Sequence, residues 1–224
     1  MNLGRSSRFF APERALALIA LAGACAQVPP RDRCRGHTAE IKAIFNADQA
    51  DRTDSSGNPK VDIDWKKISP RDAQRLRRIK EIAAEGCLRS KDDYFEAALV
   101  SQHGPTPDDY LRTYSWARKS ISLGRKKAAS LMAMAADRYL MNTGRRQIYA
   151  SQATLRDGCF CLWPVEDSAT DEDRRKMNRP SLAAQLDWID SLNAQADKVS
   201  CPKRAICADA AKPVSRGSLP DLGW

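Results

Sequence analysis

The stretch AASLMAMAADRYLMNTGRRQIYASQ, residues 128–152, decides how the rest of the chain is organised. Its first nine residues carry no charge and are mostly Ala, Met and Leu, which are good helix formers. Apolar residues on every side predict a helix surrounded by other helices, not one that lies on the surface. Asn142-Thr143-Gly144 predicts the end of this helix, because glycine is common just beyond the last turn.

Amphipathic segments on both sides predict the partners of this central helix. Each begins at a capping Ser or Thr or a helix-starting Pro and ends at a Gly, Pro or polar residue. The expected helices cover residues 38–52, 70–85, 91–103, 107–123 and 181–192, with a short helical turn after Thr170. The fold class predicted is therefore mainly α, a single-domain bundle of about six helices.

One small antiparallel β-hairpin is expected near residues 147–165. Asp157-Gly158 is a favoured two-residue hairpin turn, and the segments 147–156 and 159–165 flank it. This is the only sheet that the sequence predicts.

The N-terminus predicts export. The apolar stretch ALALIALA, residues 15–22, follows three arginines and is too short to span a bilayer, which is typical of a signal peptide over residues 1–24. Leu21-Ala22-Gly23-Ala24-Cys25 then resembles a bacterial lipobox, in which Cys25 is lipidated. The alternative is ordinary signal-peptidase cleavage after Ala24 or Ala26. A lipid-anchored tether is expected over 25–37, the helical domain over 38–200, and a Cys-containing extension with a mobile tail over 201–224.

The seven cysteines agree with export to an oxidising compartment such as the periplasm. Without Cys25 an even number remains, and we expect all of these to form disulfides: Cys34, Cys87, Cys159, Cys161, Cys201 and Cys207. Six cysteines allow fifteen pairings, and the sequence does not choose among them. Cys201 and Cys207 could close a small local loop, whereas Cys159 should not pair with Cys161. Two histidines and no CxxC argue against zinc, so no metal and no cofactor is expected.

The net charge of +9 limits the class of partner. The predicted signal peptide carries three Arg and one Glu, so +7 remains on the rest of the chain. Nucleic acid is not expected, because the chain has no recognised binding motif and its charge is spread out. Anionic lipid head groups or acidic wall polymers are compatible with this charge. The membrane is expected as a partner only through the lipid anchor.

Polar residues interrupt three of the apolar stripes. His103 closes the stripe Phe95-Leu99-His103 at a helix end, where the dipole favours a protonated ring. Asp48 and Arg52 close another stripe, and Asp137-Arg138 interrupts the central helix. We expect these ends to meet in one pocket with Gln147, Tyr149 and Gln152 at its rim. A buried structural network of the same charges is the alternative.

The same residues carry a resemblance. DQADR at 48–52, Gln102-His103, DR at 137–138 with GRRQIYASQ at 144–152, and DRR at 173–175 occur in this order. The chain thereby resembles an uncharacterised bacterial family of unknown function with the pattern DQxDR, QH, DR…GxxQxYGTQ, RR. Ala150-Ser151 stands where that family tends to have Gly-Thr. The resemblance implies a set of positions and no activity.

Three function classes follow from this pattern. The first is an exported envelope protein that binds an anionic or carbohydrate ligand through residues suited to clamp anions and hydroxyls: Arg52, Gln102, Arg138, Gln147, Tyr149, Gln152 and Arg174. The second is a hydrolytic enzyme that activates water with His103 as general acid or base, oriented by Asp48 or Asp137. The third is a structural or interaction lipoprotein in which the polar cluster only fixes helix packing.

Overall fold

The computed structural model describes residues 33–58, 60, 62–194, 200–208 and 211–214. Over these ranges the chain is mainly helical with one two-stranded antiparallel sheet, as the sequence predicts. The elements are α2 (His37–Arg52), α3 (Trp65–Ala84), α4 (Lys91–Ser101), α5 (Pro107–Ser122), α6 (Ala128–Asn142), β1 (Ala153–Arg156), β2 (Cys159–Leu162), α7 (Asp171–Lys176) and α8 (Leu182–Asn193). The predicted signal peptide, Cys25 and most of the predicted tether lie outside the described residues.

Local sequence sets most of the helix starts. Three helices begin with a capping box, in which the cap hydroxyl and an Asp three residues later each accept from the other residue's backbone N–H: Ser90–Asp93, Thr106–Asp109 and Thr170–Asp173. Two predicted starts are wrong. Helix α3 begins at Trp65 with Asp64 as its cap, so Pro70 lies inside the helix. Helix α2 begins at His37 after Gly36, whose φ of 87° suits glycine.

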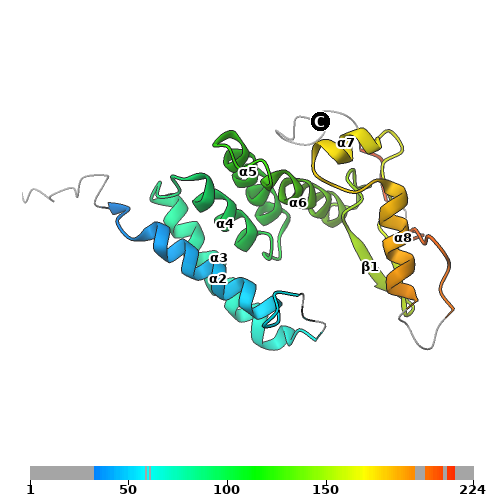
Figure 1. The fold of residues 1–224 in the computed structure, drawn as a ribbon, viewed down its shortest axis with the longest axis horizontal. Coiled ribbons are helices and arrows are strands. Elements are labelled where there is room, and N and C mark those ends of the chain that lie inside the picture. The colour runs from blue at the N-terminus through cyan, green and yellow to red at the C-terminus, as the bar shows by residue number, and fades with distance from the viewer. Residues whose placement is uncertain (1–32, 59, 61, 195–199, 209–210, 215–224) are drawn as a thin grey trace, which may run out of the picture.

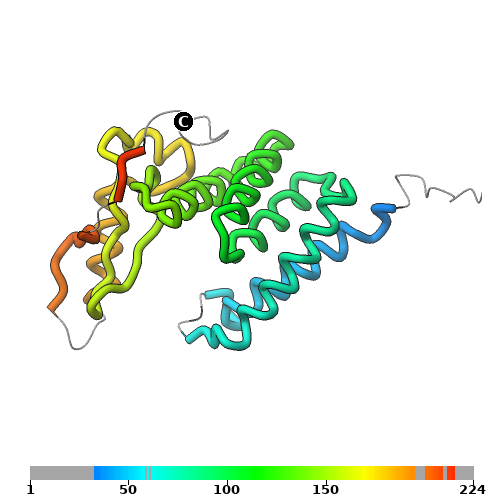
Figure 2. Tube along the Cα trace, turned by 180° about the vertical axis from the view of Figure 1, so that it is seen from behind, coloured from blue at the N-terminus to red at the C-terminus, as the bar shows by residue number. Residues whose placement is uncertain are grey.

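The described elements form an arch (Figures 1 and 2). Helices α2 and α3 make one arm, the hairpin with α8 makes the other, and α4 to α6 form the span between them. In both views the loop that joins α4 to α5 lies on the side of the span that faces the space between the arms. This arrangement brings the end of α4 close to the ends of α2 and α6.

The core runs along the arch as a series of packed apolar groups. Ile41, Ile79 and Val100 join α2, α3 and α4 in one group. Helix α6 contributes to two further groups, through Leu131 towards α4 and α5 and through Leu140 towards the segment after α6. The prediction that other helices surround α6 is therefore only partly right: among the described elements α6 packs mainly on α5, less on α4, and on the chain that follows it.

The hairpin has the turn that its sequence predicts. Asp157 and Gly158 have φ of 50° and 82°, as a two-residue turn of this kind requires. The strands pair Ala153 with Leu162 and Arg156 with Cys159. They are shorter than the predicted segments, because the chain before them turns to bind the end of α6.

Three disulfides join all six cysteines that the sequence assigns to bridges: Cys34–Cys87, Cys159–Cys201 and Cys161–Cys207. The predicted pairing of Cys201 with Cys207 in a small local loop is therefore wrong. The expectation that Cys159 does not pair with Cys161 is confirmed. These bridges indicate an oxidising compartment. None of the described helices combines the length with the apolar composition that a membrane-spanning segment needs.

The chain is packed beyond the point where we expected a mobile tail. Arg146 N–H donates to the Lys212 carbonyl at 2.9 Å, and Lys212 N–H donates to the Gly144 carbonyl at 2.9 Å. Val214 N–H donates to the buried carboxylate of Glu166 at 2.7 Å, and its side chain joins the apolar group around Leu140. Residues 211–214 thus belong to the folded domain.

Candidate ligand-binding site at the end of α4

Asp48 is the centre of a polar cluster where the C-terminal ends of α2 and α4 meet. Its side chain is fully buried. Oδ1 accepts from Arg52 Nη1 at 3.0 Å and faces His103 Nδ1 at 3.0 Å, and Oδ2 accepts from Gln49 Nε2 at 2.8 Å. These contacts satisfy a carboxylate that would be costly to bury alone. We define the His103 cluster as Asp48, Arg52, Gln102, His103 and Arg138.

His103 keeps one ring nitrogen available. Because Nδ1 faces a carboxylate that only accepts hydrogen bonds, Nδ1 carries the hydrogen. Nε2 has no hydrogen-bond partner among the described residues, and 18% of the side chain is exposed to solvent. The ring can therefore offer Nε2 to a ligand, as a donor when protonated and as an acceptor when neutral.

Charges on α2 and α3 balance one another beside this cluster. Three carboxylates alternate with three guanidinium groups: Asp48, Asp51 and Asp72 with Arg52, Arg71 and Arg75. Burial alone would raise the pKa of Asp51, but hydrogen bonds and charges from Arg75 and Arg71 lower it overall. Each of these arginines already has a carboxylate partner, so this network leaves no excess charge for a ligand.

Arg138 approaches the same cluster from α6 and has no carboxylate partner among the described residues. Its Nη1 donates to the Gln102 carbonyl at 2.7 Å, and its Nε donates to Gln152 Oε1 at 3.2 Å. Burial lowers the pKa of Arg138, and the positive charge of Arg52 acts in the same direction. A guanidinium carries five N–H donors, so most of those on Arg138 have no protein acceptor there.

Gln102 adds a polar atom without a partner. The residue is 4% exposed, and its Oε1 is buried with no hydrogen-bond partner among the described residues. Buried side-chain oxygens are usually satisfied by protein or by ordered water. Gln102 Oε1 and the remaining N–H donors of Arg138 therefore lack a hydrogen-bond partner among the described residues.

Asp137 serves a different purpose, although it is the residue next to Arg138. Neighbours in a helix point about 100° apart, so Asp137 faces the segment after α6. There it accepts from the backbone N–H of Ile148, Tyr149 and Ser151 and from the Ser151 hydroxyl, at 2.7 to 3.0 Å. Burial raises the pKa of Asp137 and these donors oppose the rise. The structure does not bring this carboxylate to His103.

The predicted rim residues are separated by the fold. Gln152 reaches the cluster through Arg138 and also donates to Ser151 Oγ at 2.9 Å. Gln147 is fully buried and holds the hairpin by bonding the backbone of Gln152 and Trp163. Tyr149 lies in the apolar group around Leu140, where burial raises its pKa.

Arg174 lies away from the His103 cluster. It is 2% exposed, donates to Asp171 Oδ1 at 2.9 Å and lines a separate cavity of about 480 Å³ with Arg146 and Glu166. The structure thus joins Asp48, Arg52, Gln102, His103, Arg138 and Gln152, and it places Asp137, Gln147, Tyr149 and Arg174 elsewhere.

The backbone at Ala150 has a conformation that suits glycine, the residue that the resembled family tends to have at this position. Its φ is 56°, in the left-handed region that disfavours side chains. Its methyl group is fully buried beside Leu162 and Ile189. A glycine would therefore relieve backbone strain here and lose some packing.

No family model, no curated protein and no solved structure matches this chain, so the resemblance to a family of unknown function stays a prediction.

Proposed function

We propose that this protein binds a small anionic ligand, a carboxylate or phosphate that also carries hydroxyl groups, at the His103 cluster. The observation that carries the proposal is Arg138, a largely buried guanidinium without a carboxylate partner in the described part of the chain. A two-point bond from an anion would satisfy its remaining donors. His103 Nε2 would add a second donor when the ring is protonated, and Gln152 suits a hydroxyl group.

Arg138→Gln tests this binding. The variant removes the charge while keeping a similar shape, so we expect the Kd of the preferred probe to rise at least about thirtyfold, or about 2 kcal/mol. The measurement is calorimetric titration of the purified protein with galacturonate and glucose 6-phosphate, with glucose as the neutral comparison. Arg77 is an exposed arginine of α3, so Arg77→Gln is the matched control and should bind as the wild type does.

Three outcomes oppose the proposal. Equal Kd values for wild type and Arg138→Gln would show that the guanidinium does not hold the anion. Failure of both anionic probes to bind more tightly than glucose would remove the anionic ligand class. A clear fall in the melting temperature of Arg138→Gln without any probe affinity in the wild type would favour the structural role instead.

Acid–base catalysis is the second candidate, because Asp48 orients the His103 ring and leaves Nε2 available. The nucleophile would be water. Ser101 is fully buried and donates to the Asp109 carbonyl, and the Ser151 hydroxyl donates to Asp137. Hydrolysis of a bound phosphate or glycoside that is lost in His103→Gln, while binding remains, would support catalysis over binding alone. Absence of turnover by wild type would oppose it.

The location of the protein is also a proposal: a lipoprotein of the periplasm, anchored through Cys25. The basic start, the short apolar stretch and the residues before Cys25 support this, and the three disulfides agree with export. Radiolabelled palmitate should label the wild type and not Cys25→Ser. No labelling of either protein would argue for ordinary signal cleavage, and equal labelling would show that Cys25 is not the lipidated residue.

A further inference from the structure

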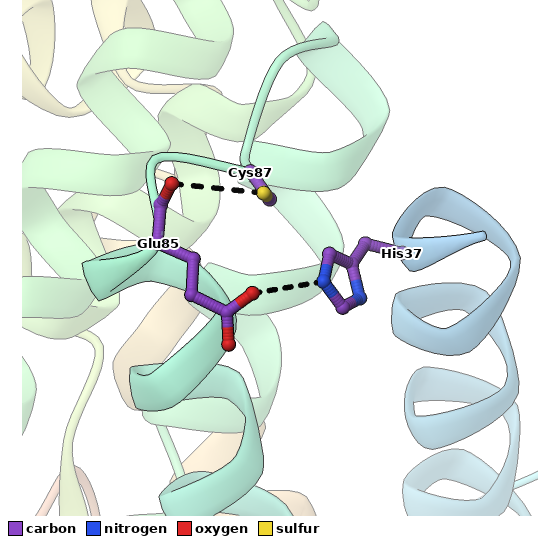
Figure 3. Close-up of side chains that lie close together, drawn as sticks. All are labelled: His37, Glu85 and Cys87. Carbon is purple, nitrogen blue, oxygen red and sulfur yellow. Dashed lines mark hydrogen bonds and ion pairs between the residues drawn. The ribbon is translucent and has the colours of Figure 1, made fainter. Parts of the chain in front are cut away.

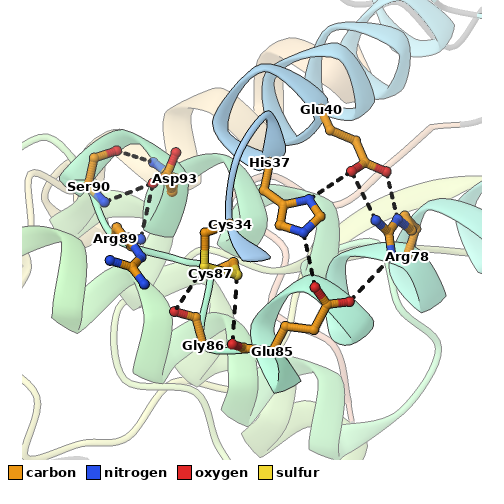
Figure 4. The surroundings of a disulfide bond; sticks show 10 residues. All are labelled: Cys34, His37, Glu40, Arg78, Glu85, Gly86, Cys87, Arg89, Ser90 and Asp93. Carbon is orange, nitrogen blue, oxygen red and sulfur yellow. Dashed lines mark hydrogen bonds and ion pairs between the residues drawn. A yellow bond between two sulfur atoms is a disulfide. The ribbon is translucent and has the colours of Figure 1, made fainter. Parts of the chain in front are cut away.

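Two of the cysteines lie beside an imidazole and a carboxylate at the start of α2 and the end of α3. Figure 3 shows the Glu85 carboxylate directed towards the His37 ring, with Cys87 close to both. A donor atom from each of these three residues lies within 4.8 Å of the other two. Figure 4 shows Cys34 bridged to Cys87 beside them. The group therefore contains two sulfurs, one nitrogen and one oxygen donor.

Local backbone geometry places these four residues together. Cys34 and His37 are three residues apart in one turn, with His37 N–H donating to the Cys34 carbonyl at 3.2 Å. Gly86 separates Glu85 from Cys87 with a φ of 75°, so the chain reverses after α3. Two short segments thus each present two donors to the same point.

The disulfide keeps a metal out of this group in the oxidised protein. Zinc binds thiolates, and a bridged sulfur is not a thiolate. A dithiol reductant would break the Cys34–Cys87 bond by thiol–disulfide exchange: it transfers two electrons and two protons, is itself oxidised to a disulfide, and leaves two cysteine thiols. These thiols would release their protons on binding the metal.

We infer that the reduced form of this protein holds Zn²⁺ between Cys34, His37, Glu85 and Cys87, so that the metal and the disulfide are alternative links between α2 and α3. Zinc–ligand bonds of about 2.0 to 2.3 Å place tetrahedral donors about 3.3 to 3.8 Å apart. His37 Nε2 and Glu85 Oε2 already lie 3.0 Å apart. Both sulfurs are already at the site as the Cys34–Cys87 bridge, and after reduction they would lie about 3.8 Å apart on the metal.

The second ring nitrogen of His37 has the partner that zinc-bound histidines usually have. Nδ1 lies 3.0 Å from Glu40 Oε2, and Arg78 holds the Glu40 carboxylate through Nε at 2.6 Å and Nη2 at 3.0 Å (Figure 4). A carboxylate on the far nitrogen fixes the ring and directs the other nitrogen to the metal. Glu40 therefore acts as a positioning residue that leaves Nε2 for zinc.

The test is a zinc titration of the full chain in the presence and absence of a phosphine reductant, with a chromogenic chelator as competitor. The phosphine takes up oxygen from water as it reduces the bridge, so electrons and protons balance. We expect the reduced wild type to bind one more Zn²⁺ than the reduced His37→Ala, and Glu40→Gln to weaken that site about tenfold or more. The oxidised protein should not bind zinc there.

Thiols released from the other two bridges need their own control. The zinc that depends on His37 should remain in Cys159→Ser/Cys201→Ser and also in Cys161→Ser/Cys207→Ser. Zinc bound at the site should also slow the return of the Cys34–Cys87 bridge under diamide, as measured by mass spectrometry. Equal zinc binding by the reduced wild type and His37→Ala, no zinc binding by the reduced wild type, or equal binding by the oxidised protein would each overturn the inference.

Discussion

Asp137→Ala should lower the free energy of unfolding by about 3 to 5 kcal/mol, one of the two largest effects that we expect from this structure. The substitution leaves the backbone N–H groups of Ile148, Tyr149 and Ser151 without their acceptor. The first two of these bonds are buried, so water cannot easily replace the lost carboxylate. Chemical denaturation measured by circular dichroism gives the difference.

Asp167 provides the matched control for this prediction. Its side chain is 87% exposed and, among the described residues, pairs with Arg146 alone, so Asp167→Ala should change stability by no more than about 0.5 kcal/mol. Asp137→Asn keeps one oxygen and should fall between wild type and Asp137→Ala. A loss below about 1 kcal/mol in Asp137→Ala would show that the segment after α6 does not depend on this residue.

Removal of the Cys161–Cys207 bridge should cost about 4 kcal/mol. The two cysteines are 46 residues apart, and closing a loop of this length restricts the unfolded chain by about that amount. The bridge also holds residues 205–207 against β2, where Leu162 N–H donates to the Ala205 carbonyl and Cys207 N–H donates to the Leu162 carbonyl, both at 2.8 Å. The double variant Cys161→Ala/Cys207→Ala, compared with wild type by denaturation, measures the effect.

Removal of the neighbouring Cys159–Cys201 bridge distinguishes the contribution of chain entropy to stability from that of local packing. Cys159 and Cys201 are 42 residues apart but only partly buried, whereas Cys161 and Cys207 are 8% and 5% exposed. Loss of either bridge should therefore cost a similar amount of chain entropy, with a further loss of packing for the Cys161–Cys207 pair. A smaller loss for that pair than for Cys159→Ala/Cys201→Ala would contradict this ranking.

Sequence patterns predicted the elements better than their boundaries. The uncharged stretch of α6 and the turn Asp157-Gly158 act locally, and both predictions are confirmed. The start of α3 was missed because Ser69-Pro70 has the sequence of a helix N-cap. The N-cap residue is Asp64, whose side chain accepts a hydrogen bond from Lys67 N–H. Ile68, upstream of Pro70, is buried in the core, and a cap pattern does not reveal such packing.

The site was only partly predictable, because its contacts join distant parts of the chain. His103 and Asp48 are 55 residues apart, and their meeting depends on how α2 packs against α4. Asp137 and Arg138 are adjacent in the sequence but bind different parts of the chain. Asp137 binds the backbone of the segment after α6, and Arg138 faces the end of α4. That difference follows from the direction of each side chain around α6, which hydropathy alone does not fix. The pairing of Arg52 with Asp72 was missed because it depends on how α2 packs against α3.

Nitrogen-15 NMR of the imidazole rings during titration with glucose 6-phosphate or galacturonate tests the central claim most directly. The chain has two histidines, and His37 is held by Glu40 and Glu85 at the opposite end of α2 from Asp48, so it serves as an internal control. We predict that His103 Nε2 shifts with saturating ligand while both His37 nitrogens stay in place, and that Arg138→Gln abolishes the shift. An unchanged His103 resonance, despite ligand bound to the protein, would place the binding site elsewhere.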